Sequence, residues 1–220
     1  GGRGTRTDTA ARRWRERIGI VLQGTGECAK VDWTFLGLSI AEWSLGWFCA
    51  LFCYALWLAL TIAGAMAATS QRAPAFAPTT MLDLGSGPGT ALWAAAEQWP
   101  SISTMHAWER ESAFIELGRK LAASSSLPAV RQAQWRQITL GSALPQHTPR
   151  YDLIVIGHVL NEMDERTRTR LVRSAWERCA GVLLIVEPGT SAAFPVVRAA
   201  RDLLLAEGAR TLAPCAHDEP

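Results

Sequence analysis

The stretch MLDLGSGPGTALWAAA, residues 81–96, decides the fold. Its first four residues predict a short buried strand that brings Asp83 to the carboxyl end of a sheet. Gly85, Gly87 and Gly89 follow, so the backbone can turn sharply and approach a ligand without an intervening Cβ. A helix is predicted directly after the last glycine, and its unpaired amides point at the same place. The sequence of strand, glycine loop and helix therefore predicts a ligand site.

Strands and helices alternate through the rest of the chain. The segment 151–157, YDLIVIG, is almost continuously apolar, as expected for a strand that is covered on both faces. We expect an α/β fold with a doubly wound, mainly parallel sheet over 79–220. The predicted strands are 81–84, 102–108, 133–140, 151–157 and 182–186, and the predicted helices are 90–98, 111–124, 164–179 and 192–206, with Gly181 and Gly208 as helix stops.

Composition limits the possible classes of protein. The chain has 220 residues, 49% of them hydrophobic, which excludes a disordered tail or a collagen-like fibre. Residues 71–220 carry fifteen basic and fifteen acidic groups, so charge alone gives no reason to expect a nucleic-acid surface there. Five unevenly spaced cysteines indicate a reducing compartment. Because the chain opens with Gly1 and stops inside a motif, we expect a fragment or an incomplete gene.

Residues 1–70 differ from the rest of the chain in the distribution of charged and apolar residues. Six arginines precede a run, 44–71, that contains no charged residue and is longer than the roughly 20 residues that cross a bilayer as a helix. Three interpretations stay open: a membrane span with its N-terminus inside, a buried helix of an N-terminal helical segment, or a stretch read in the wrong frame. The segment 71–78, QRAPAFAP, is a predicted linker.

The glycine loop resembles motif I of the class I S-adenosylmethionine-dependent methyltransferases, which have a Rossmann-like fold. Its G-x-G-x-G spacing differs from the G-x-G-x-x-G of dinucleotide-binding folds, and an acidic residue, Asp83, stands two places before the first glycine. The resemblance extends in element order over 78–188. It implies S-adenosylmethionine as cofactor, with Gly85, Ser86 and Gly87 along its methionine part and Asp83 and Gly89 in the same loop.

Other residues of this site come from the following strands. Glu109 ends the second strand and would accept hydrogen bonds from the ribose hydroxyls, or else serve only as a carboxylate at a helix N-terminus. Ile156 and Gly157 would lie across the pocket. His158 is a candidate catalytic base, with the alternative that His158 and Asn161 only hydrogen-bond loop backbone. No Asn-Pro-Pro-aromatic tetrad follows, so exocyclic base amines are disfavoured as acceptor.

The C-terminal part of the sequence points to a more specific family. It resembles the bacterial and mitochondrial small-ribosomal-subunit methyltransferase-like family, through an E-P-G-T strand end, a helix and a G-A-x-x-L-A-P-C-x-H motif. The matching residues are Glu187, Pro188, Gly189, Thr190, Arg201, Leu204, Gly208, Ala209, Leu212, Ala213, Pro214, Cys215 and His217.

This resemblance implies a role in rRNA methylation or in assembly of the small ribosomal subunit. The expected location is the bacterial cytoplasm, or the mitochondrial matrix in a eukaryote. The resemblance also implies that Cys215 begins an iron–sulfur ligand set that is incomplete here. It further implies that the domain is C-terminally truncated, with one sheet edge exposed. Two alternatives stay open: a non-catalytic assembly factor that keeps the cofactor fold, and a small-molecule methyltransferase anchored to a membrane through 44–71.

Overall fold

A computed structural model describes residues 34–141 and 143–214. The chain divides into two compact units, Gly1–Tyr54 and Ala55–Pro220. The described part of the first unit holds a hairpin of β1 (Thr34–Phe35) and β2 (Leu38–Ser39). Helix α2 (Ile40–Arg72) begins in the first unit and ends in the second.

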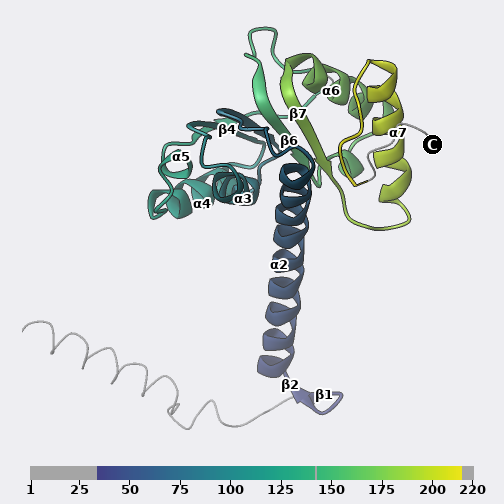
Figure 1. Cartoon of the computed structure of the whole chain (residues 1–220). Helices are drawn as coiled ribbons and strands as arrows, with labels where there is room; N and C mark the ends of the chain where they lie inside the picture. Colours follow the sequence, from purple (N-terminus) through teal and green to yellow (C-terminus); the bar gives the residue numbers. More distant parts are fainter. Residues whose placement is uncertain (1–33, 142, 215–220) are drawn as a thin grey trace, which may run out of the picture. The chain divides into compact units, whose positions relative to one another are not determined.

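The second unit contains a five-stranded sheet in the order β5-β4-β3-β6-β7. All of its strand pairs are parallel, which confirms the predicted mainly parallel sheet. Figure 1 shows α3, α4 and α5 on one side of this sheet and α6 and α7 on the other. The strands are β3 (Thr80–Leu84), β4 (Thr104–Glu109), β5 (Gln134–Gln137), β6 (Tyr151–Gly157) and β7 (Cys179–Val186), and the helices are α3 (Thr90–Gln98), α4 (Ser112–Ala123), α5 (Pro128–Arg131), the 3-10 turn η2 (Leu160–Glu162), α6 (Glu165–Arg178) and α7 (Ala193–Ala206).

Two apolar layers hold the sheet. On one face the buried side chains of α3 pack on Met81, Leu153 and Val155, and on the other those of α6 and α7 pack on Leu82 and Ile154. Because successive strand residues point to opposite faces, a strand covered on both sides is apolar throughout, which explains YDLIVIG.

Polar contacts fix the ends of several elements. At the start of β6, Asp152 Oδ2 accepts hydrogen bonds from the backbone amide and hydroxyl of Thr79, both at 2.8 Å, and from the amide of Thr80 at 3.1 Å. These bonds join the N-terminal ends of β3 and β6. Asp164 caps the N-terminus of α6, because its Oδ1 accepts from the amide of Thr167 at 3.0 Å.

The prediction that Gly181 stops a helix is wrong. Helix α6 ends at Arg178, and Gly181 lies inside β7, which begins three residues earlier than expected. A Cβ at Gly181 would come within 2.6 Å of the Asp152 carbonyl oxygen and 2.8 Å of Phe76. The glycine is therefore required by the close approach of β6 and not by a helix terminus.

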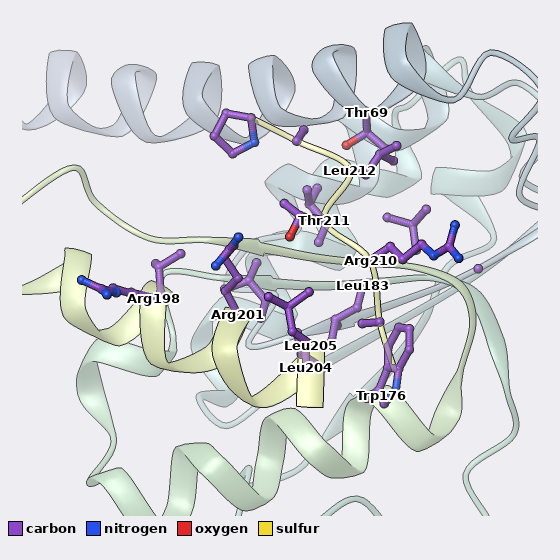
Figure 2. A pocket seen from close by; sticks show the side chains of 18 of the residues that line it. Thr69, Trp176, Leu183, Arg198, Arg201, Leu204, Leu205, Arg210, Thr211 and Leu212 are labelled. Carbon is purple, nitrogen blue, oxygen red and sulfur yellow. The ribbon is translucent and has the colours of Figure 1, made fainter. Parts of the chain in front are cut away.

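Strand β7 forms one edge of the sheet, as the sequence predicts for one of the two edges. A groove of about 690 Å³ runs along it, between β7, α7 and the segment 209–214. Figure 2 shows its apolar lining, including Leu183 and Leu204, and the arginines Arg198 and Arg201 close by. Residues Val182 to Ile185 of this strand are only half-buried.

Candidate functional site

The glycine loop lies at the carboxyl ends of β3 and β4. The amides of Gly85 and Ser86 donate to the Trp108 carbonyl oxygen at 2.8 and 3.1 Å, which ties the loop to the end of β4. Gly85, Gly87 and Gly89 all have positive φ angles, of 76°, 53° and 94°. Such a backbone path is open to glycine at little cost, so the sequence prediction of a sharp turn is confirmed.

The three glycines meet different neighbours. A Cβ on Gly85 would collide with Cγ2 of Val159, and one on Gly89 would lie 2.7 Å from the Trp135 ring. A Cβ on Gly87 would meet nothing within 4 Å. Gly85 and Gly89 are therefore needed for protein packing, whereas Gly87 borders open space that a ligand can enter.

Glu109 belongs to the same cluster. Its Oε2 accepts the amide of Gly87 at 2.8 Å, and its Oε1 accepts the amides of Arg110 and Glu111 at 2.8 and 2.9 Å. Glu109 as a residue is 8% exposed, so it is not the exposed carboxylate of the alternative interpretation. A carboxylate has about four lone-pair positions, and three are occupied here. Both ribose hydroxyls can therefore bind only if one backbone amide moves away.

Asp83 is the most perturbed acid of the site. It is 2% exposed, and its Oδ2 has no hydrogen-bond partner in the part of the chain that the structure describes. Burial, and secondly the charge of Glu109, raise the pKa of Asp83 to about 7. A buried acceptor without a donor is costly, so this oxygen marks a position where a bound group could donate.

Ile156 and Gly157 end β6 beside the end of β3, since Ile156 pairs with Leu84. A Cβ on Gly157 would lie 3.4 Å from Cδ1 of Ile62, so the second part of α2 covers this strand end. The structure thus joins the glycine loop and Glu109 by a hydrogen bond, with Asp83 just before the loop and the end of β6 adjoining it.

His158 has an unusual backbone. Its φ is 59°, a left-handed conformation that residues other than glycine rarely adopt, and its amide donates to the Val186 carbonyl oxygen at 2.8 Å. Both ring nitrogens are buried without a hydrogen bond of normal geometry, although the carbonyl of Leu58 is close enough to favour the protonated ring. Burial has the larger effect and lowers the pKa of His158. Burial therefore favours the neutral form of the ring.

The contact of the Asn161 side chain differs from the one considered from the sequence, which was a hydrogen bond to loop backbone. The side chain instead donates through Nδ2 to Glu187 Oε2 at 2.7 Å. Sequence reasoning placed Glu187 in a family motif without giving it a part in the site. Its position directly after an apolar strand is the signal that could have pointed to it, because parallel strands carry functional side chains at their carboxyl ends.

Metal-ligand groupings are absent from the two described ranges: they contain no cluster of three or more His, Cys, Asp or Glu side chains suited to a metal ion. The described cysteines are free thiols, with Cys49 and Cys53 exposed on α2 and Cys179 buried at the start of β7. Cys215 and His217 lie outside the described residues.

Solved structures of similar fold are methyltransferases. The glycopeptide N-methyltransferase MtfA complexed with S-adenosyl-L-methionine is 21% identical over 55% of this chain and 48% of that chain, with a TM-score of 0.45. The plantazolicin methyltransferase BpumL is 17% identical over 58% of this chain and 47% of that chain, with a TM-score of 0.46.

The N-terminal part matches a different family. Residues 8–58 match the family described as disulfide bond formation protein DsbB. Disulfide bond formation protein B of Acinetobacter baumannii is 57% identical over 37 residues, which are 17% of this chain and 22% of that protein.

The larger part of the chain matches a single family. The human mitochondrial ribosome assembly protein METTL17 is 30% identical over 186 residues, which cover 75% of this chain and 40% of that protein. The chain thus spans about two fifths of this relative's length. The family described as mitochondrial small ribosomal subunit Rsm22 matches residues 57–220, which is most of the chain. Because this match covers more than half of the chain, it shows that the chain belongs to the Rsm22 family.

Proposed function

We propose that residues 79–220 form the S-adenosylmethionine-binding part of a methyltransferase-like protein of the small ribosomal subunit. One observation carries the proposal: the amide of Gly87 is held by Glu109 at 2.8 Å while the α-carbon of Gly87 faces open space. The unpartnered Oδ2 of Asp83 next to this loop fits a ligand that brings its own donors.

The cofactor supplies an already activated methyl group when it is bound. The residues of this chain bind and orient it. Asp83, Gly85, Ser86, Gly87 and Gly89 would border its amino-acid part, with Glu109 toward the ribose and the Ile156–Gly157 strand end opposite. Holding an acceptor in line with the methyl group is the main remaining requirement for transfer.

A matched pair of glycine variants tests the cofactor site. Gly87 and Gly208 both have positive φ and open space where a Cβ would be, and only Gly87 lies in the proposed site. Asparagine tolerates positive φ, so Gly87→Asn fills the space with little backbone strain. Calorimetry should show affinity for S-adenosylmethionine at least about tenfold weaker in Gly87→Asn and unchanged in Gly208→Asn. Equal affinity in both variants contradicts the site.

Two forms of this function remain distinct: methylation of small-subunit rRNA, and assembly of the subunit without methyl transfer. The name of the human relative, a ribosome assembly protein, supports a role in assembly. The place of His158 directly after the end of β6, beside the proposed cofactor site, supports a base for catalysis. Methyl transfer to purified small subunits, measured beside assembly in cells that carry a binding-deficient variant, separates the two. The expected compartments are the bacterial cytoplasm or the mitochondrial matrix.

The iron–sulfur part of the proposal concerns Cys215. Four cysteine thiolates are the usual cluster ligands, and the described cysteines, Cys49, Cys53 and Cys179, do not group with other metal ligands. The described residues therefore do not fit a cluster by themselves. We propose that Cys215 contributes one ligand to an iron–sulfur set whose other thiolates are not those of Cys49, Cys53 or Cys179.

Helix α2 supports a second candidate property, attachment to a lipid bilayer. It is the one helix in 34–141 and 143–214 that is long and apolar enough to cross a membrane, by length and composition. Its 33 residues correspond to about 50 Å, against about 30 Å of bilayer hydrocarbon. No charged residue lies between Glu42 and Arg72, and large side chains such as Trp47 and Phe48 are exposed.

A charge placed in α2 tests this second candidate. Leu51→Arg should release the protein from membranes, because arginine at the centre of a spanning helix costs roughly 2.5–3.5 kcal/mol. Leu117→Arg, on an exposed position of α4, is the matched control and should not change flotation with lipid vesicles. Flotation unchanged by Leu51→Arg argues against insertion of α2.

A further inference from the structure

The loop after β6, residues 158–162, packs against the glycine loop. The side chain of Val159 occupies the place where a Cβ on Gly85 would be. The amide of His158 donates to the Val186 carbonyl oxygen at 2.8 Å, so the same loop is also joined to the end of β7. The position of this loop therefore decides how much room remains beside the glycine loop.

The Glu187 side chain holds the loop with both of its oxygens. Oε1 accepts the amide of Leu160 at 2.7 Å, and Oε2 accepts Nδ2 of Asn161 at 2.7 Å. Leu160 is fully buried, so its amide has no access to water if this acceptor is lost. Glu187 stands directly after β7, and its carboxylate connects the last strand of the sheet to a loop 26 residues earlier.

We propose that Glu187 and Asn161 are positioning residues that fix the 158–162 loop against the glycine loop and thereby set the width of the cofactor pocket. The identity of the ligand rests on the proposed function, whereas the contact itself does not. A carboxylate with both oxygens engaged is suited to this task, since charge-assisted hydrogen bonds are short and directional. Neither side chain needs to touch the cofactor.

In the hydrogen bond between Asn161 and Glu187, a double substitution can exchange donor and acceptor while the bond itself is kept. Glu187→Gln alone turns an NH₂ group toward one of the two donors, and Asn161→Asp alone sets two carboxylates face to face. Each single variant should weaken binding of S-adenosylhomocysteine by about tenfold, as for loss of a hydrogen bond to a charged group. In the double variant, Asn161→Asp with Glu187→Gln, the residue at 187 donates its NH₂ group to the carboxylate at 161, so the bond between the side chains is restored with donor and acceptor reversed. Its carbonyl oxygen still accepts the amide of Leu160.

Calorimetry on the full 220-residue chain should therefore find the double variant within about threefold of the unmodified protein. Glu177→Gln is the matched control. It makes the same chemical change at an exposed position of α6, away from the 158–162 loop. A double variant as weak as the single variants, or singles that bind normally, would overturn the proposal.

Hydrogen exchange tests the same contact without a cofactor. In Glu187→Gln, amides of 158–162 and of the glycine loop 85–89 should exchange about tenfold faster together, and exchange should slow again in the double variant. Faster exchange confined to 158–162 would overturn the coupling of the two loops. If the unmodified chain binds neither S-adenosylmethionine nor S-adenosylhomocysteine, the proposed function fails, and exchange still decides the role of Glu187.

Discussion

The buried Asp83 carboxyl should make the stability of this protein depend on pH in an unusual direction. Its pKa is raised from 3.8 to about 7 in the folded chain, first by burial and then by the charge of Glu109. In the unfolded chain the group keeps its ordinary value. Between the two values the folded protein holds a proton that the unfolded chain has lost. The free energy of unfolding therefore falls as pH rises from about 4 to about 7.

The size of the effect follows from the two pKa values. Each pKa unit corresponds to about 1.4 kcal/mol, so this single group should lower the free energy of unfolding by about 4 kcal/mol between pH 4 and pH 7.5. In Asp83→Asn the side chain cannot ionise, and this contribution disappears. The other titrating groups are common to both proteins, so they cancel when the two stabilities are subtracted at each pH.

Urea unfolding, followed by tryptophan fluorescence in one non-ionic detergent from pH 4.5 to pH 8, measures the difference. We expect Asp83→Asn to gain stability relative to the unmodified chain as pH rises toward 7.5. Glu177→Gln removes an exposed carboxylate from α6 and is the control, for which the difference should stay nearly constant. If the Asp83→Asn curve runs parallel to that of the unmodified protein, the carboxyl ionises normally and our account of its burial is refuted.

Three further predictions concern the same domain. Glu109→Gln replaces one of the two carboxylate oxygens that together accept three backbone amides, so S-adenosylmethionine affinity and folding stability should each fall by roughly 1.5–3 kcal/mol. If calorimetry and urea unfolding give unchanged values, Glu109 has no part in the cofactor site. His158→Ala should lower turnover by roughly 10² to 10⁴ with cofactor affinity nearly intact, and an unchanged rate would leave His158 a purely structural residue. Anaerobic reconstitution of this chain with iron and sulfide should give no complete cluster; a full cluster that survives Cys215→Ser would show that our assignment of Cys215 is wrong.

Local sequence patterns predicted much of the fold. The bounds of α3 and β6 agree with the prediction residue for residue, because a glycine loop precedes α3 and an uninterrupted apolar run marks β6. The start of β7 was missed, since Gly181 is equally typical of a helix end and of a strand that lies close to a neighbour. Only the distance to the Asp152 carbonyl oxygen separates these two cases.

The sequence predicted those residues of the site that belong to a recognisable motif or stand at the end of a predicted strand. Asp83, Gly87 and Glu109 lie together because motif and strand order bring two neighbouring strand ends side by side. The bond between Asn161 and Glu187 could not be foreseen, since it joins two loops through tertiary structure. Likewise, nothing in the residue type of His158 indicates a left-handed backbone, which depends on the connection to β7.

The half-buried edge strand β7 has a consequence for the behaviour of the purified protein. Val182 to Ile185 are apolar, with side chains that alternate between the two faces of the sheet, on an edge where backbone groups can pair with another strand. Two molecules that pair along this edge would extend both sheets and cover both edge strands. Solutions of this chain should therefore self-associate as concentration rises, and the tendency should persist at high salt because it does not depend on charge.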